Sequence, residues 1–205
     1  SLQWFTDGCD PTWSAASAIG TGNGPLRVHA PPDALRQAGF FFGKPETFSL
    51  DRDGAHLRFF LYGGKVSFDT AVATKYTLDI LHAERALFGD EDPTPFYAFM
   101  RVLPQSTSKV HGGGNLYGYT SVVGPAAEWN PRMRNHLAHE LMHHWIGVGL
   151  WVVDAQKVSG YWFTEGFTVR YARTIALRTG AIAPQEYLDE INRHAAGYYA
   201  SEVRG

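Results

Sequence analysis

The stretch from Asn130 to Trp145 constrains this 205-residue chain more than any other, because it reads as a helix from its first residue. The side chain of Asn130 is suited to cap a helix N-terminus. Pro131 suits the first helical position, where a missing N–H group costs nothing. Apolar residues recur along the stretch, which predicts a helix buried in a domain rather than one lying on its surface. They are Leu137, Leu141, Met142, Trp145 and Ile146.

The same stretch contains the sequence H-E-L-M-H, which begins at His139 and ends at His143. Positions four apart lie one turn apart on the same helix face, so the two imidazoles can aim at one zinc ion. Glu140 is offset from both and can reach a metal-bound water without ligating the metal. Because this pattern also occurs by chance in proteins that bind no metal, other features must decide.

The deciding feature is a carboxylate in the run Y-W-F-T-E-G-F-T, residues 161–168. Thr164 is expected to cap the next helix, which would place Glu165 in its first turn. A glutamate there also interacts favourably with the helix dipole. Beside two histidines, we favour the interpretation that Glu165 is a third metal ligand.

The runs H-E-L-M-H-H-W and W-F-T-E-G-F-T resemble the gluzincin zinc metallopeptidases. The second run is most similar to the glycyl aminopeptidase branch, whose members often carry a PDZ module. The alanyl aminopeptidase and leukotriene A4 hydrolase branch comes second, because it spaces its ligands differently. The resemblance covers about residues 112–171. It implies a hydrolase that uses one Zn²⁺ ion held by His139, His143 and Glu165, with Glu140 as the general base.

The resemblance also implies a fold. We expect an α+β, thermolysin-like catalytic domain with an N-terminal α/β subdomain over residues 1–129, built on a mixed sheet with a helix. The H-E-x-x-H helix and a helical zinc-binding part follow over residues 130–205. Relatives continue past the second active-site helix, so this helical part is expected to be incomplete. In relatives an edge strand pairs with the substrate backbone, and we assign that role to Asn115–Val123.

Hydrophobic spacing predicts the remaining elements. A helix is expected from Ser67 or Asp69 to Phe88, ended by Gly89, and Asp51–Gly54 is a hairpin signal. Strands are expected over residues 26–29, 40–43, 46–50, 56–62 and 96–103, and helices over residues 32–38, 165–179 and 184–199. The acidic run 90–95 is expected to be a solvated surface loop. Arg170, Arg173 and Arg178 are expected to form a solvated helix face.

A glycine run at residues 112–114 precedes the predicted edge strand. Beside a metal site such a run allows close approach of backbone to a ligand, although taken alone it is most simply a flexible turn. Candidate substrate-binding residues here are Gly113, Gly114, Asn115 and Tyr117. His136 is a candidate to line the cleft or to support the ligands, whereas His144 lies about 140° around the helix from His139 and is interpreted as structural.

The glycine run also marks a departure from the relatives. Aminopeptidases of both branches carry a glutamate in this strand that captures the free amine of the substrate. This chain has no acidic residue in register there, and Glu128 lies beyond the strand. The change favours an endopeptidase, or an exopeptidase that reads the N-terminus in another way. It equally supports a rival hypothesis, a non-catalytic or weakly active peptidase-like domain that binds peptides or proteins.

The donor that stabilises the oxyanion is a downstream tyrosine in relatives. Tyr198, Tyr199 and His194 are candidates here by residue type alone, and helix packing or surface exposure is the simpler interpretation. A purely structural zinc site is disfavoured, because such sites close with four protein ligands, mostly cysteine.

Composition limits the partners. The formal net charge is −2 with no long run of either sign, so the expected partner is a peptide or protein substrate rather than nucleic acid. No apolar stretch approaches membrane-spanning length. The single cysteine, Cys9, is interpreted as a bystander. No charged-then-apolar leader begins the sequence, and the family resemblance favours a periplasmic or secreted location. The oligomeric state is not predicted.

Overall fold

The computed structural model describes the whole chain except residues 1–2, 6, 23–31, 106–109, 153–159 and 203–205. Its strands are β1 (Ser14–Ser17), β2 (Gly20–Thr21), β3 (Phe40–Gly43), β4 (Glu46–Arg52), β5 (Ala55–Tyr62), β6 (Phe96–Val102), β7 (His111–Asn115) and β8 (Gly118–Val123). Its helices are α1 (Pro32–Gln37), α2 (Thr70–Phe88), α3 (Pro131–Met142), α4 (Tyr161–Arg178) and α5 (Pro184–Ala200). The chain is therefore mixed α+β, as expected.

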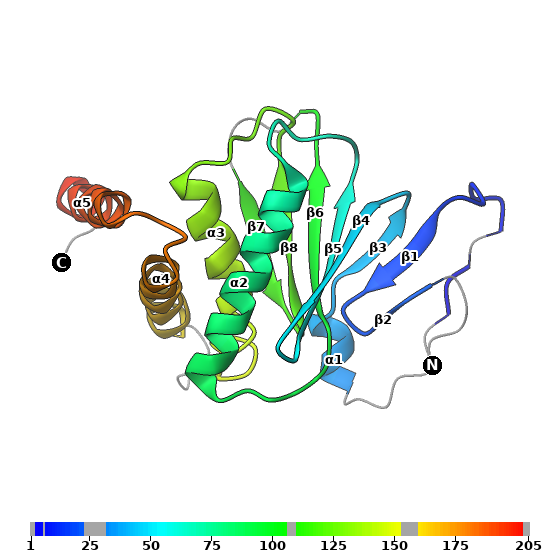
Figure 1. Cartoon of the computed structure of the whole chain (residues 1–205), viewed down its shortest axis with the longest axis horizontal. Coiled ribbons are helices and arrows are strands. Elements are labelled where there is room, and N and C mark those ends of the chain that lie inside the picture. Colours follow the sequence, from blue (N-terminus) through cyan, green and yellow to red (C-terminus); the bar gives the residue numbers. More distant parts are fainter. Residues whose placement is uncertain (1–2, 6, 23–31, 106–109, 153–159, 203–205) are drawn as a thin grey trace.

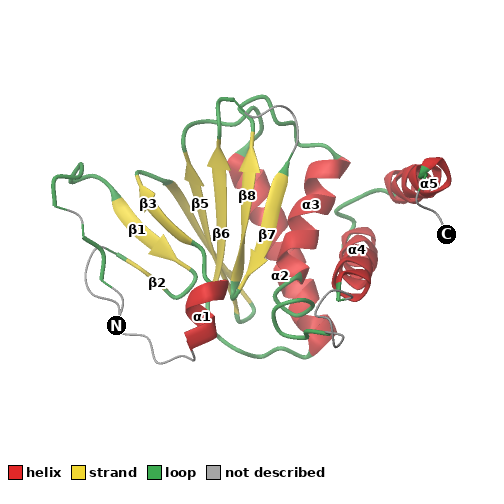
Figure 2. Cartoon of the chain, turned by 180° about the vertical axis from the view of Figure 1, so that it is seen from behind, coloured by secondary structure: helices red, strands yellow, loops and turns green. Residues whose placement is uncertain are grey.

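A five-stranded mixed sheet forms the centre, in the order β4-β5-β6-β8-β7. The β4–β5 and β7–β8 pairs are antiparallel, and the β5–β6 and β6–β8 pairs are parallel. Helices α2 and α3 lie across one face of this sheet, and α4 and α5 lie beyond α3 (Figure 1). Figure 2 shows the opposite face, beside which the small sheet β2-β1-β3 lies. The sheet thus has α2 and α3 on one side only.

Successive side chains along the central strands point to opposite faces of the sheet, which explains how both faces are covered. On β5, Phe59 and Leu61 belong to the core beneath the helices, whereas Phe60 and Tyr62 belong to a second cluster on the other face. That second cluster includes Phe99 of β6, on which the ring of Phe41 from β3 stacks at 4.5 Å. Because successive side chains of a strand point to opposite faces, near-continuous apolar runs build a two-sided core.

Helix α2 begins and ends where capping chemistry predicts. The Asp69 carboxylate accepts a hydrogen bond from the Ala71 N–H group, and Gly89 adopts the left-handed conformation with φ 61°. Ala73, Tyr76 and Ile80 are buried as the spacing predicts, but Leu87 is 43% exposed. The buried face of α2 ends before the last turn of the helix, because that turn extends past the core.

The predicted strand Asn115–Val123 is wrong as a single element. Residues 116–117 form a turn, so that β7 and β8 are two strands of a hairpin. Strand β8 lies between β6 and β7, and the sheet edge is β7, which includes the glycine run. The interpretation of that run as a flexible turn is therefore also wrong. Tyr117 turns the chain with φ 51°, and its carbonyl accepts a 2.8 Å hydrogen bond from the Tyr97 N–H group.

Two helix boundaries differ from their predictions. Helix α3 ends at Met142 rather than Trp145, because the N–H groups of His144 and Trp145 bond three residues back in tight turns. Helix α4 begins at Tyr161, so Thr164 is not its cap and Glu165 is not in its first turn. The Thr164 hydroxyl instead donates to the Gly160 carbonyl at 3.0 Å, as an interior helical threonine does.

The acidic loop after α2 is not simply solvated. Asp90 accepts a hydrogen bond from the Trp145 indole at 3.1 Å, and Asp92 accepts one from the Tyr117 hydroxyl at 2.8 Å. These bonds attach the loop to the segments that follow α3 and β7. They use the carboxylates as structural acceptors, and hydrogen bonds to Thr94 are the first cause that lowers the pKa of Asp92.

The remaining sequence predictions have the following outcomes. The predicted strand over residues 26–29 lies outside the described residues, and Cys9 is exposed with a free thiol. The division of the chain between residues 129 and 130 stays a prediction, and one buried cluster takes side chains from both sides of it, including Leu61 and Ala172. Within the described part of the chain, no helix is long and apolar enough to cross a membrane.

The sequence pattern gave no signal for Glu84, a carboxyl group fully buried on α2. Neither of its oxygens has a hydrogen-bond partner among the described residues. Burial raises its pKa well above the usual value of 4.5, because a charged carboxylate loses its hydration there.

This burial predicts a pH-dependent stability. Between pH 4.5 and its raised folded-state pKa, Glu84 keeps its proton in the folded chain and loses it in the unfolded one, so stability falls as pH rises. The slope is up to about 1.4 kcal/mol per pH unit. Glu84→Gln removes this pH dependence. In urea titrations, the free energy of unfolding of the variant minus that of the wild type is therefore expected to increase from pH 4.5 to pH 8. A difference that does not change with pH contradicts a raised pKa at Glu84.

Candidate metal centre

The first two residues of the candidate centre are presented by α3. The Asn130 side chain accepts a hydrogen bond from the Met133 N–H group at 3.0 Å, and Pro131 occupies the first turn, both as predicted. His139 lies in the last turn, and His143 caps the helix with helical dihedrals (φ −60°, ψ −20°). The helical spacing therefore holds up to His143, and the two Nε2 atoms are 3.0 Å apart.

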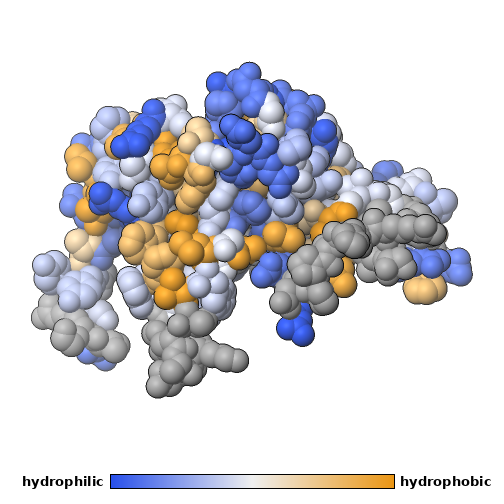
Figure 3. All heavy atoms as spheres, turned by 90° about the horizontal axis from the view of Figure 1, so that it is seen from below, coloured by the Kyte–Doolittle hydropathy of each residue, from blue (hydrophilic) through white to orange (hydrophobic). Residues whose placement is uncertain are grey.

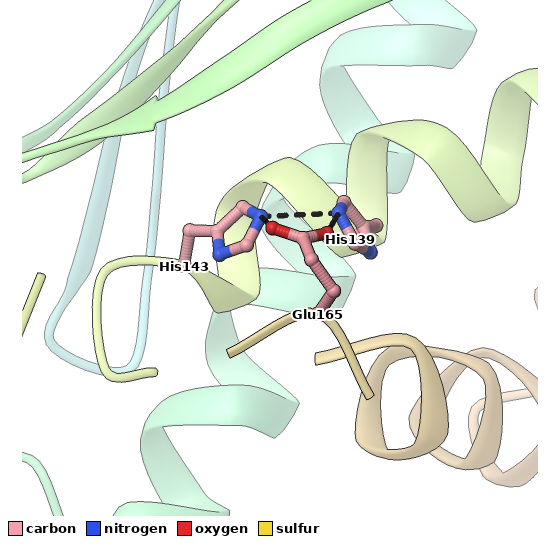
Figure 4. Close-up of side chains that lie close together, drawn as sticks. All are labelled: His139, His143 and Glu165. Carbon is pink, nitrogen blue, oxygen red and sulfur yellow. Dashed lines mark hydrogen bonds and ion pairs between the residues drawn. The ribbon is translucent and has the colours of Figure 1, made fainter. Parts of the chain in front are cut away.

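Glu165 reaches the same point from α4. Its Oε2 lies 3.2 Å from His139 Nε2 and its Oε1 lies 3.6 Å from His143 Nε2. Figure 4 shows the carboxylate pointing between the two imidazole rings. Each residue offers one donor atom within a set whose members all lie within 4.8 Å of one another. The structure thus brings together the three side chains that the sequence pattern selected.

The donor set fits zinc in both chemistry and spacing. Two imidazole nitrogens and one carboxylate oxygen are ligands that zinc accepts, and this combination is typical of catalytic rather than structural sites. For ligands around a tetrahedral ion, neighbouring donor atoms are about 3.3 Å apart. The observed separations of 3.0, 3.2 and 3.6 Å lie around that value. The side chain of Glu165 is 48% exposed, so the cluster is open on its side.

A backbone contact orients His143 for metal binding. Its Nδ1 lies 3.0 Å from the Ile146 carbonyl oxygen, which can only accept a hydrogen bond. The ring proton is therefore on Nδ1, and Nε2 keeps the lone pair that faces His139 and Glu165. Burial, followed by interactions with the charges of His143, His136 and Arg173, lowers the pKa of His139 to about 3, so the His139 imidazole is neutral at pH 7.

Glu140 and His136 form a buried pair behind the ligands. His136 Nδ1 lies 3.4 Å from Glu140 Oε1, and His136 Nε2 lies 3.1 Å from the hydroxyl of Ser121 on β8. Burial lowers the pKa of His136 to about 4, so the contact with Glu140 is not an ion pair at neutral pH. Burial, and then the Glu165 charge, raise the pKa of Glu140 to about 8. His136 therefore contacts Glu140, and it also lines a cavity beside His139.

Strand β7 passes close to the cluster because it lacks side chains there. A Cβ atom on Gly114 would lie 2.1 Å from the Cβ of His143, and one on Gly112 would lie 2.9 Å from the Glu140 carboxyl carbon. Gly113 faces the other way, where a Cβ would meet nothing within 4 Å. The close approach anticipated for a glycine run beside a metal site is therefore present at positions 112 and 114.

The other candidate substrate-binding residues are held by neighbours. The Asn115 amide donates to the Thr120 hydroxyl at 2.8 Å, which fixes it within the hairpin. The Tyr117 N–H group donates to His144 Nδ1 at 3.1 Å, and its hydroxyl reaches Asp92. His144, which also packs edge-on against Phe96 at 4.7 Å, has the structural role expected of it.

A cavity of about 340 Å³ adjoins the cluster at His143 and Glu165. Gly114, Trp151 and Thr164 contribute to its walls. Trp151 is 65% exposed, and the view from below shows several apolar patches among polar residues (Figure 3). Nothing in the sequence around Trp151 distinguishes a residue that lines a cavity from one that anchors a loop.

The α5 residues considered as oxyanion donors are exposed or contact neighbouring side chains. Tyr198 and Tyr199 are 58% and 67% exposed and pack on each other, as the simpler interpretation expected. His194 contacts Arg173, which is 15% exposed and pairs with Glu190 at 3.7 Å, so the expectation that Arg173 is solvated is wrong. Arg173 lies near enough to the cluster for its charge to contribute to the lowered pKa of His139.

Comparisons with known proteins agree with this geometry. Residues 132–205, which contain all three candidate ligands and Glu140, match the family model of M61 glycyl aminopeptidase. The chain is similar to the crystal structure of an aminopeptidase N family protein from Idiomarina loihiensis, with a TM-score of 0.67 and 18% identity. That similarity covers 87% of this chain and 34% of the other, so the chain spans about a third of that protein's length. A search of curated proteins finds no match.

The family match confirms the resemblance to the glycyl aminopeptidase branch of the gluzincins. The structural similarity, at 18% identity, shows that this chain shares its fold with part of that protein. Neither comparison tests the roles of individual residues, which rest on the distances and contacts above.

The glycine contacts predict a selective effect on metal affinity. Gly114→Ala forces a methyl group against His143, so we expect zinc affinity to fall about 10- to 100-fold as the imidazole is displaced. Gly113→Ala, on the same strand with open space around it, is the matched control and should bind zinc as the wild type does. Competition with a chromophoric chelator measures both. Equal affinities for the two variants would show that β7 does not position His143.

Proposed function

We propose that this chain is the zinc-binding part of a peptidase that hydrolyses peptide bonds, with Glu140 as the general base. The observation that carries the proposal is the convergence of His139, His143 and Glu165 donor atoms within 4.8 Å. The family match over residues 132–205 supports it, because that segment contains the whole cluster. A thermolysin-like catalytic fold, in which α3 and α4 present the ligands, belongs to the same proposal.

The residues divide the chemistry among them. A bound zinc ion would supply Lewis-acid activation of water and of the scissile carbonyl. Glu140 accepts the proton of the attacking water and delivers it to the leaving amine. Its burial beside His136 restricts the orientations open to the carboxylate, which favours its action as a general base. The ionised, proton-accepting form of Glu140 would be favoured by the charge of a bound metal, which would oppose the effect of burial on its pKa.

The substrate would bind along β7. This strand has β8 as its neighbour on one side and forms the edge of the described sheet, so its outer N–H and C=O groups can pair with an extended peptide. The glycines at 112 and 114 keep that edge close to Glu140 and His143. The cavity of about 340 Å³ at His143 would take a substrate side chain.

The N-terminal amine of the substrate would not be recognised as it is in an aminopeptidase. No aspartate or glutamate occurs from His111 to Val123, so nothing on β7 or β8 offers a carboxylate to a free amine. We therefore propose an endopeptidase, or an exopeptidase that does not use an amine-binding glutamate. A periplasmic or secreted location and the division at residue 129 are proposed on the family resemblance alone.

The absence of an amine-binding carboxylate also supports a second candidate function, a peptidase-like domain that binds peptides without cleaving them. Both candidates share the metal site and the edge strand. They differ in whether Glu140 transfers a proton, so the decisive experiment changes that residue.

Glu140→Gln is expected to keep zinc at near wild-type affinity and to lower the hydrolysis of quenched-fluorescence peptides by about 100-fold or more. Glu165→Ala is expected to lose both zinc affinity and hydrolysis, because it removes a ligand. Zinc content by mass spectrometry and peptide turnover are measured on the same preparations.

Glu128→Gln, at an exposed glutamate outside the site, serves as the matched control and should behave as the wild type. Hydrolysis that survives Glu140→Gln contradicts the mechanism. A wild-type chain that binds one equivalent of zinc and peptides but cleaves none supports the binding domain instead.

A further inference from the structure

A second cavity, of about 140 Å³, adjoins the metal cluster at His139. The first cavity adjoins the cluster at His143 and Glu165, so the two cavities flank it. Residues of α3, α4 and α5 form the walls of the second cavity, and neither the mechanism nor the edge strand gives it a role. We refer to it as the α3–α5 cavity.

The charged residues that line the α3–α5 cavity are mostly cationic. Three arginines, Arg132, Arg173 and Arg193, face a single glutamate, Glu190. Glu190 is already engaged, at 2.6 Å by Arg193 and at 3.7 Å by Arg173. One carboxylate cannot neutralise three guanidinium groups, so the cavity retains a net positive charge.

Two of the arginines have unused donors. Arg132 is exposed and makes no hydrogen bond or ion pair with the described residues. Arg173 makes its recorded contacts with His194 and Glu190 through Nη2 alone. Its Nε and Nη1 groups, on a side chain only 15% exposed, remain available to a ligand. A guanidinium group presents its donors in a planar fork that matches a carboxylate.

The strongest sign of a ligand is Asn135. This residue is 9% exposed and lines the cavity, and neither its amide nitrogen nor its amide oxygen has a hydrogen-bond partner among the described residues. An unpaired buried polar group costs about 1–3 kcal/mol. An apolar residue would avoid this cost, so the amide is expected to serve a partner that enters the cavity.

We propose that the α3–α5 cavity is a substrate subsite that binds a carboxylate group. The proposal rests on the proposed peptidase function, because the cavity shares His139 with the metal cluster and would receive the part of a peptide next to the cleaved bond. The Asn135 amide and the free donors of Arg132 and Arg173 form the recognition set. The cavity volume is about that of four or five liquid water molecules, which suits a carboxylate on a short aliphatic stem.

Such a subsite would give the site a basis for substrate selection in place of the acidic residue that β7 lacks. A peptide would be selected by a negative group held between α3 and α4 rather than by its free amine. That negative group comes either from an aspartate or glutamate side chain or from the C-terminus of the peptide. Both sources offer the same chemistry, so the experiment separates them.

The test measures binding of three small probes to the zinc-loaded chain by NMR titration. N-acetylglutamate α-amide carries only a side-chain carboxylate, N-acetylalanine carries only a terminal one, and N-acetylalanine amide carries none. At least one carboxylate probe is expected to bind about 10-fold more tightly than the neutral probe. Tighter binding of the first probe identifies an acidic side chain, and tighter binding of the second identifies a C-terminus.

Two variants locate the binding. Arg132→Gln and Asn135→Leu are each expected to weaken carboxylate binding about 3- to 10-fold. Arg178→Gln, which removes the same charge from an exposed position on α4, is the matched control and should change nothing. Asn135→Leu is expected to keep or raise the melting temperature, because it removes an unpaired buried amide. A lost signal then reports lost recognition and not unfolding.

Direct ligation of a carboxylate to zinc is distinguished by the same variants, because it does not respond to Arg132→Gln more than to Arg178→Gln. Equal binding of all three probes, or equal effects of all three variants, overturns the subsite. The readout is binding and does not require turnover. A chain that is inactive but binds carboxylates through Arg132 and Asn135 would contradict the proposed peptidase function and support the subsite. A chain that is active but does not prefer carboxylates would support the peptidase function and contradict the subsite.

Discussion

The close packing of α4 against the end of α3 is the constraint on which the site depends. Ala172 and Ala176 of α4 are buried in the same core cluster as Leu137 and Leu141 of α3, and their small side chains allow the two helices to approach. That approach sets Glu165 against two imidazoles whose positions α3 has already fixed. A helix–helix interface therefore determines whether three polar groups from different parts of the chain can share one cation.

Strand β7 borders the candidate site together with α3 and α4. Gly112 and Gly114 let the backbone lie against Glu140 and His143, where a Cβ atom at either position would collide. Among the described residues, no strand pairs with the outer side of β7, and natural proteins usually protect such a sheet edge from pairing with other chains. An edge with minimal side chains beside a candidate metal site is suited to a substrate backbone. The two flanking cavities then differ in character: one has aromatic and apolar walls, and the other is lined by arginines.

The sequence predicted the site better than the elements around it. His139, His143 and Glu165 follow a spacing rule tied to helix geometry, and Asn130 and Pro131 mark a helix start, so these predictions needed no tertiary information. The glycine strand was missed because glycine has no β propensity of its own. Its pairing with β8 and its approach to α3 decide its conformation. The start of α4 was missed because Gly160 precedes it without a side-chain cap, and Glu84 broke no visible pattern.

Anomalous diffraction from crystals of the zinc-loaded chain, recorded on both sides of the zinc absorption edge, tests the central claim most directly. We expect a single strong peak about 2.0–2.2 Å from His139 Nε2, His143 Nε2 and a Glu165 carboxylate oxygen, with no fourth protein ligand. A peak at another place in the chain, or a Glu165 side chain turned away from a metal held by the histidines, would contradict it.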